Sequence, residues 1–397
     1  MNVGVGWCTT LGGGFAPSIG VNLIVTFTLG IPFRFLVLIG RSISVVFFRK
    51  ITTLTSLICS GIRFLDTSHI ILIAQCFPLL QELDLSFPKK CSYNILNGLL
   101  QPLEPLSLAL SKLRKAGHSY INDPSLFHLF KNCEFLEEAI LFGCHRLTNS
   151  GIVSALAERP TLRSLSFTIY SEPRDCSTLF ALLKNTLSLT EIRMEYSLNI
   201  IVHNSNSFMD IFVRPQLESL RLAHNSWLSD ESIKAFASVF PNLQLLVLSY
   251  CTNISEQGIF HILRRCCKIK HLNLSGCLRV KLLGMNFETP KLEVLNLSRT
   301  HVDDETLFVI SKSCRTLLQL LLEHCNDVTD KGVKHVLENC SQLREINLRG
   351  CLKMHKDVFH SMVFSRPSLR KVIVPTRSLF SNKELKLLSR QGCLFCK

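Results

Sequence analysis

The chain has 397 residues, of which 47% are hydrophobic and 19% charged, and its formal net charge is +14. This composition excludes an intrinsically disordered protein and supplies enough apolar material for a long continuous core. The basic residues are scattered, and no basic run is interleaved with aromatic residues. The charge therefore predicts a solvated surface, and we expect no nucleic acid among the partners.

Residues 1–50 form an atypical hydrophobic segment that differs from the rest of the chain. Positions 21–39 reach the length of about twenty residues that a membrane-spanning helix needs. Pro32 and Arg34 lie near the middle of this stretch, and a central arginine opposes insertion into a bilayer. Three interpretations stay open here: a membrane anchor, a remnant or misread coding segment, and a cap over the first repeat.

From about residue 51 to 397 the pattern L-x-x-L-x-L recurs, mostly every 26 residues, as from Leu217 to Leu243. A period of about 20–29 residues with this pattern is typical of the leucine-rich repeat. The spacing is least regular around Leu113, at 33 and then 23 residues, and the pattern there lacks its second half, which predicts a shortened strand. Thirteen starts align: Leu54, Leu80, Leu113, Leu136, Leu162, Leu189, Leu217, Leu243, Ile269, Leu292, Leu317, Leu343 and Leu369.

Each repeat is predicted to form one strand followed by one helix. Alternating apolar residues, as in 343–348, indicate a half-buried strand, and Ile233, Phe236, Ala237 and Phe240 have the spacing of one helix face. Stacking such repeats buries faces that no single repeat can bury alone. The expected fold is α/β: a leucine-rich-repeat solenoid, or horseshoe, with parallel strands on the concave face and helices on the convex face.

The 17 cysteines follow the repeat rather than a disulfide pattern. A small side chain that can bond the turning backbone fits the position eight residues after the first leucine. Buried, reduced thiols at such positions indicate the cytoplasm or the nucleus. The residues at this position are Cys144, Asn225, Cys251, Cys277, Thr300, Cys325 and Cys351.

The segments 340–351 (CSQLREINLRGC) and 328–333 (VTDKGV) carry the pattern C-x-x-L-x-x-L-x-L-x-x-C followed by T/S-D/E-x-G-[IV]. With 76–87 and 290–300, they resemble the cysteine-containing repeats of plant F-box/LRR proteins. The resemblance implies a substrate receptor of an SCF-type ubiquitin ligase, in which the repeats grip the target and an F-box docks on the adaptor. Residues 1–50 contain nothing like an F-box.

In each strand, the fourth and sixth residues of L-x-x-L-x-L should point into the core. The residue between them and the one just after them should point to the concave face. We expect a protein target to bind there through a mixed polar surface, although each residue alone could be merely solvated. The candidate protein-binding residues are Glu191, Arg193, Glu195, Arg221, His271, Asn273, Asn296, Glu323, Glu345, Asn347 and Arg349.

No pattern indicates an active site, and we expect no catalytic residue, metal or cofactor. Cys393 and Cys396 form one C-x-x-C without the second pair that a zinc site requires. The chain has no G-x-S-x-G nucleophile elbow, and Gly12–Gly14 is not followed by the Lys of a phosphate loop. The predicted function is ligase-related protein recognition. The alternative is a stand-alone interaction scaffold, with membrane tethering through 21–39 as a further alternative.

Overall fold

The computed structural model describes residues 35–37, 54–58, 77, 79–84, 112–114, 122–144, 146–168, 176–184, 186–194, 212–375, 380–390 and 392–396. The chain divides into two compact units. Unit 1 comprises Met1–Glu172 with Ala181–Leu189, and unit 2 comprises Pro173–Phe180 with Thr190–Lys397. Of the predicted features, Glu195 and most of the apolar stretch 21–39 lie outside the described residues.

Unit 1 contains a parallel sheet whose strands pair in chain order. Two helices follow its later strands, and helix α4 (Cys176–Lys184) is shared between the units. The strands are β1 (Phe35–Val37), β2 (Ser56–Ile58), β3 (Glu82–Asp84), β4 (Lys112–Arg114), β5 (Glu138–Leu141) and β6 (Ser164–Phe167), and the helices are α2 (Asp123–Asn132) and α3 (Asn149–Ala157).

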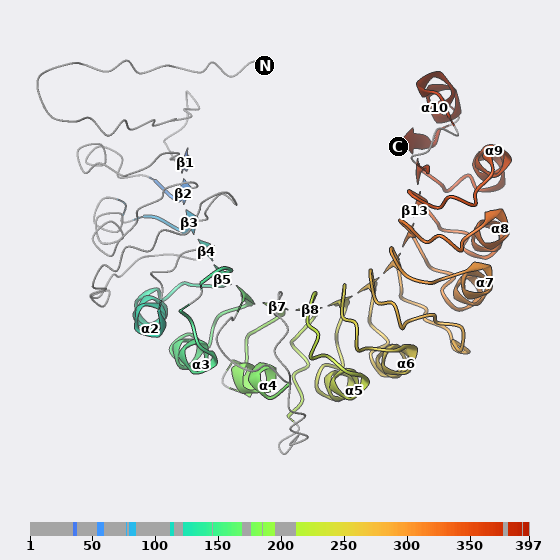
Figure 1. Cartoon of the computed structure of the whole chain (residues 1–397). Coiled ribbons are helices and arrows are strands. Elements are labelled where there is room, and N and C mark those ends of the chain that lie inside the picture. Colours follow the sequence, from blue (N-terminus) through green and yellow to red (C-terminus); the bar gives the residue numbers. More distant parts are fainter. Residues whose placement is uncertain are drawn as a thin grey trace, which may run out of the picture. The chain divides into compact units, whose positions relative to one another are not determined.

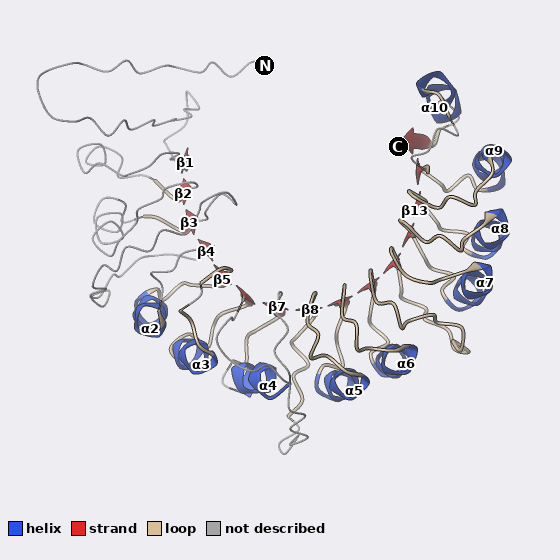
Figure 2. Cartoon of the chain, viewed as in Figure 1, coloured by secondary structure: helices blue, strands red, loops and turns tan. Residues whose placement is uncertain are grey.

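Unit 2 repeats this arrangement with nine strands that pair in parallel and in chain order. Within this unit the strands lie on the inner side of an arc and the helices on its outer side (Figures 1 and 2). The strands are β7 (Glu191–Met194), β8 (Ser219–Arg221), β9 (Leu245–Val247), β10 (His271–Asn273), β11 (Val294–Asn296), β12 (Gln319–Leu321), β13 (Glu345–Asn347), β14 (Lys371–Ile373) and β15 (Leu394–Cys396). The helices are α5 (Asp230–Val239), α6 (Glu256–Arg265), α7 (Asp304–Ser313), α8 (Asp330–Asn339), α9 (Lys356–Ser365) and α10 (Asn382–Ser389).

The leucine positions of the repeat form the core. Leu217, Leu243, Leu317 and Leu343, which were predicted to be equivalent, are all fully buried. The residue after each of these leucines donates its backbone N–H to a carbonyl of the previous repeat. For example, Gln244 N–H donates to the backbone carbonyl of Glu218. The predicted helix faces are also confirmed, because the apolar face of α5 is buried. The repeated pattern therefore specified which side of each strand and helix faces inward.

The alignment at Leu113 was wrong by three residues. Leu113 is in register with Leu83 and Ala139, which occupy the fourth position of their own repeats. The repeat therefore starts at position 110 of the sequence, and β4 has three residues, as β3 does. A lone leucine does not distinguish the first from the fourth position of L-x-x-L-x-L, whereas strand pairing does.

The expectation of one helix for every repeat fails between β10 and β11. Residues 274–293 contain turns and no helix, and this repeat is short, with 23 residues from Ile269 to Leu292. Val280, Leu282 and Met285 bury their side chains in place of a helix face. None of the helices in the described residues is long and apolar enough to cross a membrane.

Candidate functional site

The first and third residues of the strands in unit 2 form a continuous surface, which we call the strand face. The middle residues, such as Leu220, Leu272 and Ile346, are buried, whereas their neighbours on either side are half-buried or exposed. Register places equivalent residues side by side, as with Asn273 and Asn296. Because neighbouring strands are about 4.8 Å apart, side chains of adjacent repeats lie within reach of one another.

At one end of the strand face a carboxylate joins two repeats. Glu191 Oε1 accepts hydrogen bonds from Ser219 Oγ at 3.2 Å and from Arg221 Nε at 3.1 Å. The side chains of Glu191 and Arg221 are 38% and 35% exposed. Arg193 is the register partner of Arg221, so two guanidinium groups occur on adjacent strands. This end of the strand face therefore presents positive charge.

A second pair lies farther along the same face. Lys371 Nζ donates to Glu345 Oε1 at 2.8 Å, and this bond is the main cause that raises the pKa of Lys371 above its ordinary value. Lys371 was not among the predicted residues, although it is the register partner of Glu345. The position of Lys371 two residues after Leu369 could have identified it from the repeat alone.

The asparagines of the strand face support their own strand ends. Asn273, Asn296 and Asn347 each accept, through Oδ1, the N–H of the residue two positions later at 3.0 Å. The asparagines were expected either to contact a target or to be merely solvated. Instead, the side-chain oxygen of each asparagine accepts a backbone hydrogen bond within a turn.

The remaining predicted residues lie near these strands. His271 is exposed in β10, whereas Glu323 and Arg349 follow β12 and β13 and are half-buried. The N–H of Glu323 donates to Ser298 Oγ at 3.1 Å. Except for Glu195, which is outside the described residues, the predicted residues all belong to the strand face or to its border in unit 2.

A row of left-handed residues borders the strand face and was missed in the sequence. His224, Tyr250, Arg299 and His324 have φ angles between 58° and 62°, and Gly276 occupies the same turn at 71°. The rings of His224 and Tyr250 stack with centroids 4.7 Å apart. A Cβ at Gly276 would lie 2.5 Å from the Tyr250 ring. Glycine is therefore required beneath this stack.

The predicted cysteine position bonds the backbone of the preceding repeat. Cys251 Sγ donates to Leu222 O at 3.1 Å, and Cys277 Sγ donates to Leu248 O at 3.0 Å. Burial raises the pKa of Cys251 to about 12 and that of Cys277 to about 11. These thiols stay protonated at neutral pH and are poor nucleophiles.

Among the residues that the structure describes, no group of three or more His, Cys, Asp or Glu side chains is arranged to hold a metal ion. Cys393, the first cysteine of the C-x-x-C, is buried, and its pKa is raised to about 11 by burial.

Solved structures identify the architecture. Yeast Rad7, from its complex with Elc1, matches with a TM-score of 0.57 and 16% identity over 86% of this chain and 80% of that one. TLR13, from a complex with ssRNA13, matches with a TM-score of 0.51 and 18% identity over 86% of this chain and 52% of that one. The fold is a leucine-rich-repeat solenoid.

Sequence relatives of this leucine-rich-repeat protein are distant. The bovine (Bos taurus) F-box/LRR-repeat protein 4 is 24% identical over 189 residues, which are 44% of this chain and 29% of that protein. The DNA repair protein rhp7 of Schizosaccharomyces pombe is 26% identical over 204 residues, which are 42% of this chain and 36% of that protein. The chain thus spans about a third of each relative's length. No protein-family model matches it.

Proposed function

We propose that this leucine-rich-repeat protein recognises a polypeptide through the strand face of unit 2. The observation that supports the proposal is the row of half-buried and exposed side chains in strand register, which is polar at β7, β8, β10 and β13 and apolar at β9. Tyr250 and His324, which are exposed, border this row. The inner sheet of a solenoid is the usual binding surface of repeat proteins. The bonds from Glu191 to Arg221 and from Glu345 to Lys371 hold these side chains before a partner arrives, which lowers the entropy lost on binding.

We further propose that the chain serves as a substrate-recognition component related to SCF-type ubiquitin ligases, in the cytoplasm or nucleus. The similarity to F-box/LRR-repeat protein 4 and to Rad7 in complex with Elc1 supports this role. In this proposal the protein is not itself an enzyme. The division into an N-terminal segment 1–50 and a repeat region 51–397, which stays a prediction, would leave the repeats free to hold the target.

Photo-crosslinking tests recognition by the strand face. A photoreactive amino acid placed at His271, exposed in β10, should crosslink a discrete polypeptide in cells. The matched control is His261, which is also exposed but lies on α6. The additional substitution Arg221→Glu should abolish the adduct at position 271. Equal adducts at 261 and 271, or none at 271, would contradict the proposal.

Binding of purified partners tests the ligase link separately. The full chain is mixed with the SCF adaptor and, in a second experiment, with Elc1, and complexes are sought by size-exclusion chromatography. A stoichiometric complex with either protein supports the link. Failure with both refutes it and leaves the stand-alone scaffold, which the crosslinking experiment still tests.

A further inference from the structure

Unit 2 has one edge at which helices end and the next strands begin, and cations gather there from α6 to β14. The nine cations named at the end of this paragraph are exposed except Lys270, which is half-buried. The carboxylates in the same turns are Glu288, Glu293 and Glu338. We call this set of cations the basic edge: Arg264, Arg265, Lys268, Lys270, Lys291, Lys312, Arg315, Arg344 and Arg370.

The cations of the basic edge form no ion pair with any carboxylate that the structure describes. Within the described residues, every ion pair of unit 2 involves other cations, such as Arg221, Lys353 or Lys371. Glu338, the acidic residue in the last turn of α8, contacts His335 instead. The basic edge therefore carries more cations than carboxylates, whereas Arg221 and Lys371 of the strand face each form an ion pair.

Helix dipoles explain only part of this charge. Arg264 and Arg265 lie in the last turn of α6, and Lys312 lies in the last turn of α7. A cation there complements the negative end of the helix, but the effect falls off within that turn. The other members, such as Lys268 and Lys291, lie beyond the helix ends. Their concentration on one edge has no role in helix capping.

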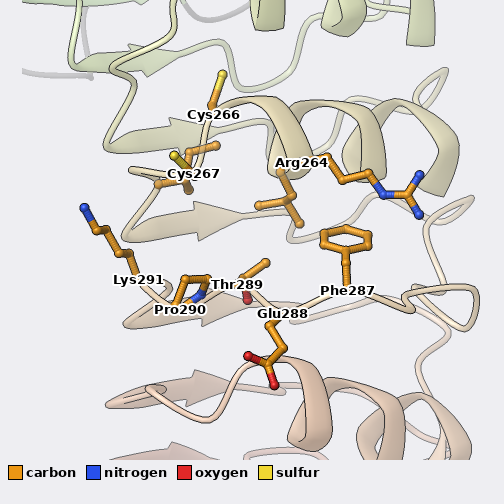
Figure 3. Close-up of a pocket in the computed structure, with 10 residues that line it drawn as sticks. Arg264, Cys266, Cys267, Phe287, Glu288, Thr289, Pro290 and Lys291 are labelled. Carbon is orange, nitrogen blue, oxygen red and sulfur yellow. The ribbon is translucent and has the colours of Figure 1, made fainter.

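The missing helix between β10 and β11 shapes the densest part of the edge. A small pocket of about 170 Å³ lies there, lined by Arg264, Cys267, Phe287 and Lys291 among others (Figure 3). Arg264 donates to Asn286 Oδ1 at 2.8 Å, and its guanidinium lies 4.6 Å from the centroid of the Phe287 ring. Arg264 is thus held in position, which reduces the entropy lost when it binds an anion.

We propose that the basic edge binds an acidic segment of a protein partner. An extended polypeptide rich in Asp and Glu would place carboxylates along successive repeats, and each carboxylate would meet a cation that forms no ion pair within the described residues. This inference does not rest on the strand-face proposal, because it concerns another surface and requires no ligase link.

A protein segment fits this edge better than a nucleic acid does. Single-stranded nucleic acid binding relies on aromatic faces on which bases stack. Phe287, the aromatic side chain in this pocket, has one face covered by Arg264. Glu288 and Glu293 would also repel a continuous phosphate backbone, whereas a peptide can place uncharged residues beside them.

Charge reversal at exposed positions tests the proposal with the full chain. The edge variant is Arg265→Glu, Lys268→Glu and Lys291→Glu. The control variant is Lys331→Glu, Lys334→Glu and Lys383→Glu, which makes the same change in net charge at exposed residues of α8 and α10. Circular dichroism verifies that both fold. The probes are fluorescein-labelled decaglutamate and a short labelled DNA duplex, and binding is followed by fluorescence anisotropy.

The native chain should bind decaglutamate saturably, and added salt should weaken the binding. The edge variant should raise the Kd about tenfold, and the control variant by less than about twofold. The duplex should bind more weakly and lose affinity equally in both variants. The proposal is overturned by absence of saturable peptide binding, by equal losses for the peptide in both variants, or by tighter duplex binding that only the edge variant loses.

Discussion

Asp304, at the start of α7, binds Thr329, the N-cap of α8 in the next repeat. Asp304 Oδ1 accepts the Thr329 backbone N–H at 2.9 Å, and Oδ2 accepts the Thr329 hydroxyl at 2.6 Å. Asp304 Oδ1 also accepts the N–H of Gly332 at 3.0 Å. Asp230 makes the same pair of bonds to Ser255. The T/S-D-x-G pattern therefore encodes a contact between repeats, in which the aspartate of one meets the threonine and glycine of the next.

Gly332→Ala should destabilise the protein by about 2 kcal/mol, although alanine is ordinarily the better helix residue. The added Cβ would lie 2.4 Å from Asp304 Oδ1 and 3.0 Å from the Asp304 Cα. The change is measured by urea unfolding. Lys331→Ala, an exposed substitution in the same turn, should change the free energy of unfolding by less than about 0.5 kcal/mol. A neutral or stabilising Gly332→Ala would show that the two repeats adjust freely.

Asp304→Ala should lower the free energy of unfolding by about 2–3 kcal/mol, because two backbone N–H groups and one hydroxyl lose their acceptor. Glu305→Ala is the control: it removes a carboxylate from the same first turn of α7, so both variants lose the same helix-dipole interaction. The comparison uses urea midpoints at neutral pH. Equal losses from the two variants would mean that charge at the helix start, not the contact with Thr329, supplies the stability.

Asn296→Ala should cost about 1 kcal/mol, because the Ser298 N–H loses the acceptor that Asn296 Oδ1 provides. Asn296→Asp keeps an acceptor oxygen and should stay within about 0.5 kcal/mol of the native protein. Chemical denaturation of both variants measures the difference. If both unfold at the native urea concentration, the turn does not need this bond.

The buried thiols should weaken the protein at alkaline pH. Burial raises the pKa of Cys351 from its ordinary 9.0 to about 12. Below about pH 9 both the folded and unfolded forms keep this proton, and the full stability is present. Between pH 9 and 12 the unfolded chain releases the proton first, so stability falls on the order of 1 kcal/mol per thiol by about pH 10. From pH 8 to pH 10, the free energy of unfolding should fall less in Cys351→Ala than in the native protein. Urea unfolding of both proteins at these two pH values measures the difference. An identical loss would contradict the effect.

Arg159→Met should loosen α2 in unit 1. Arg159 is buried and donates to the carbonyls of Phe130 at 2.8 Å, Lys131 at 2.9 Å and Glu134 at 3.0 Å. Because Arg159→Met removes charged donors from the carbonyls at the C-terminus of α2, it should lower the free energy of unfolding by about 2–3 kcal/mol. Hydrogen exchange of the α2 amides should accelerate accordingly. The control Arg163→Met, which alters a 67% exposed side chain, should leave exchange unchanged, and acceleration in both would refute the assignment.

The repeat by itself determined the parallel strands, the buried leucines, the inward helix faces and the cysteine position. These follow from a period written in every repeat, because alternation and helical spacing fix which face of an element can be buried. The strand face followed for the same reason, and Lys371 could have been named from its position two residues after Leu369.

The tertiary structure decided what depends on side chains that meet across about 25 residues of sequence. Strand register moved Leu113 to the fourth position of its repeat, and stacking revealed that Asp304 binds Thr329 and Gly332. The pairing of Glu191 with Arg221 and the gathering of cations at the basic edge likewise appeared only when the repeats lay side by side. The sequence period describes positions within one repeat, whereas these contacts join two repeats. Which side chains come within bonding distance is therefore decided only when the repeats stack.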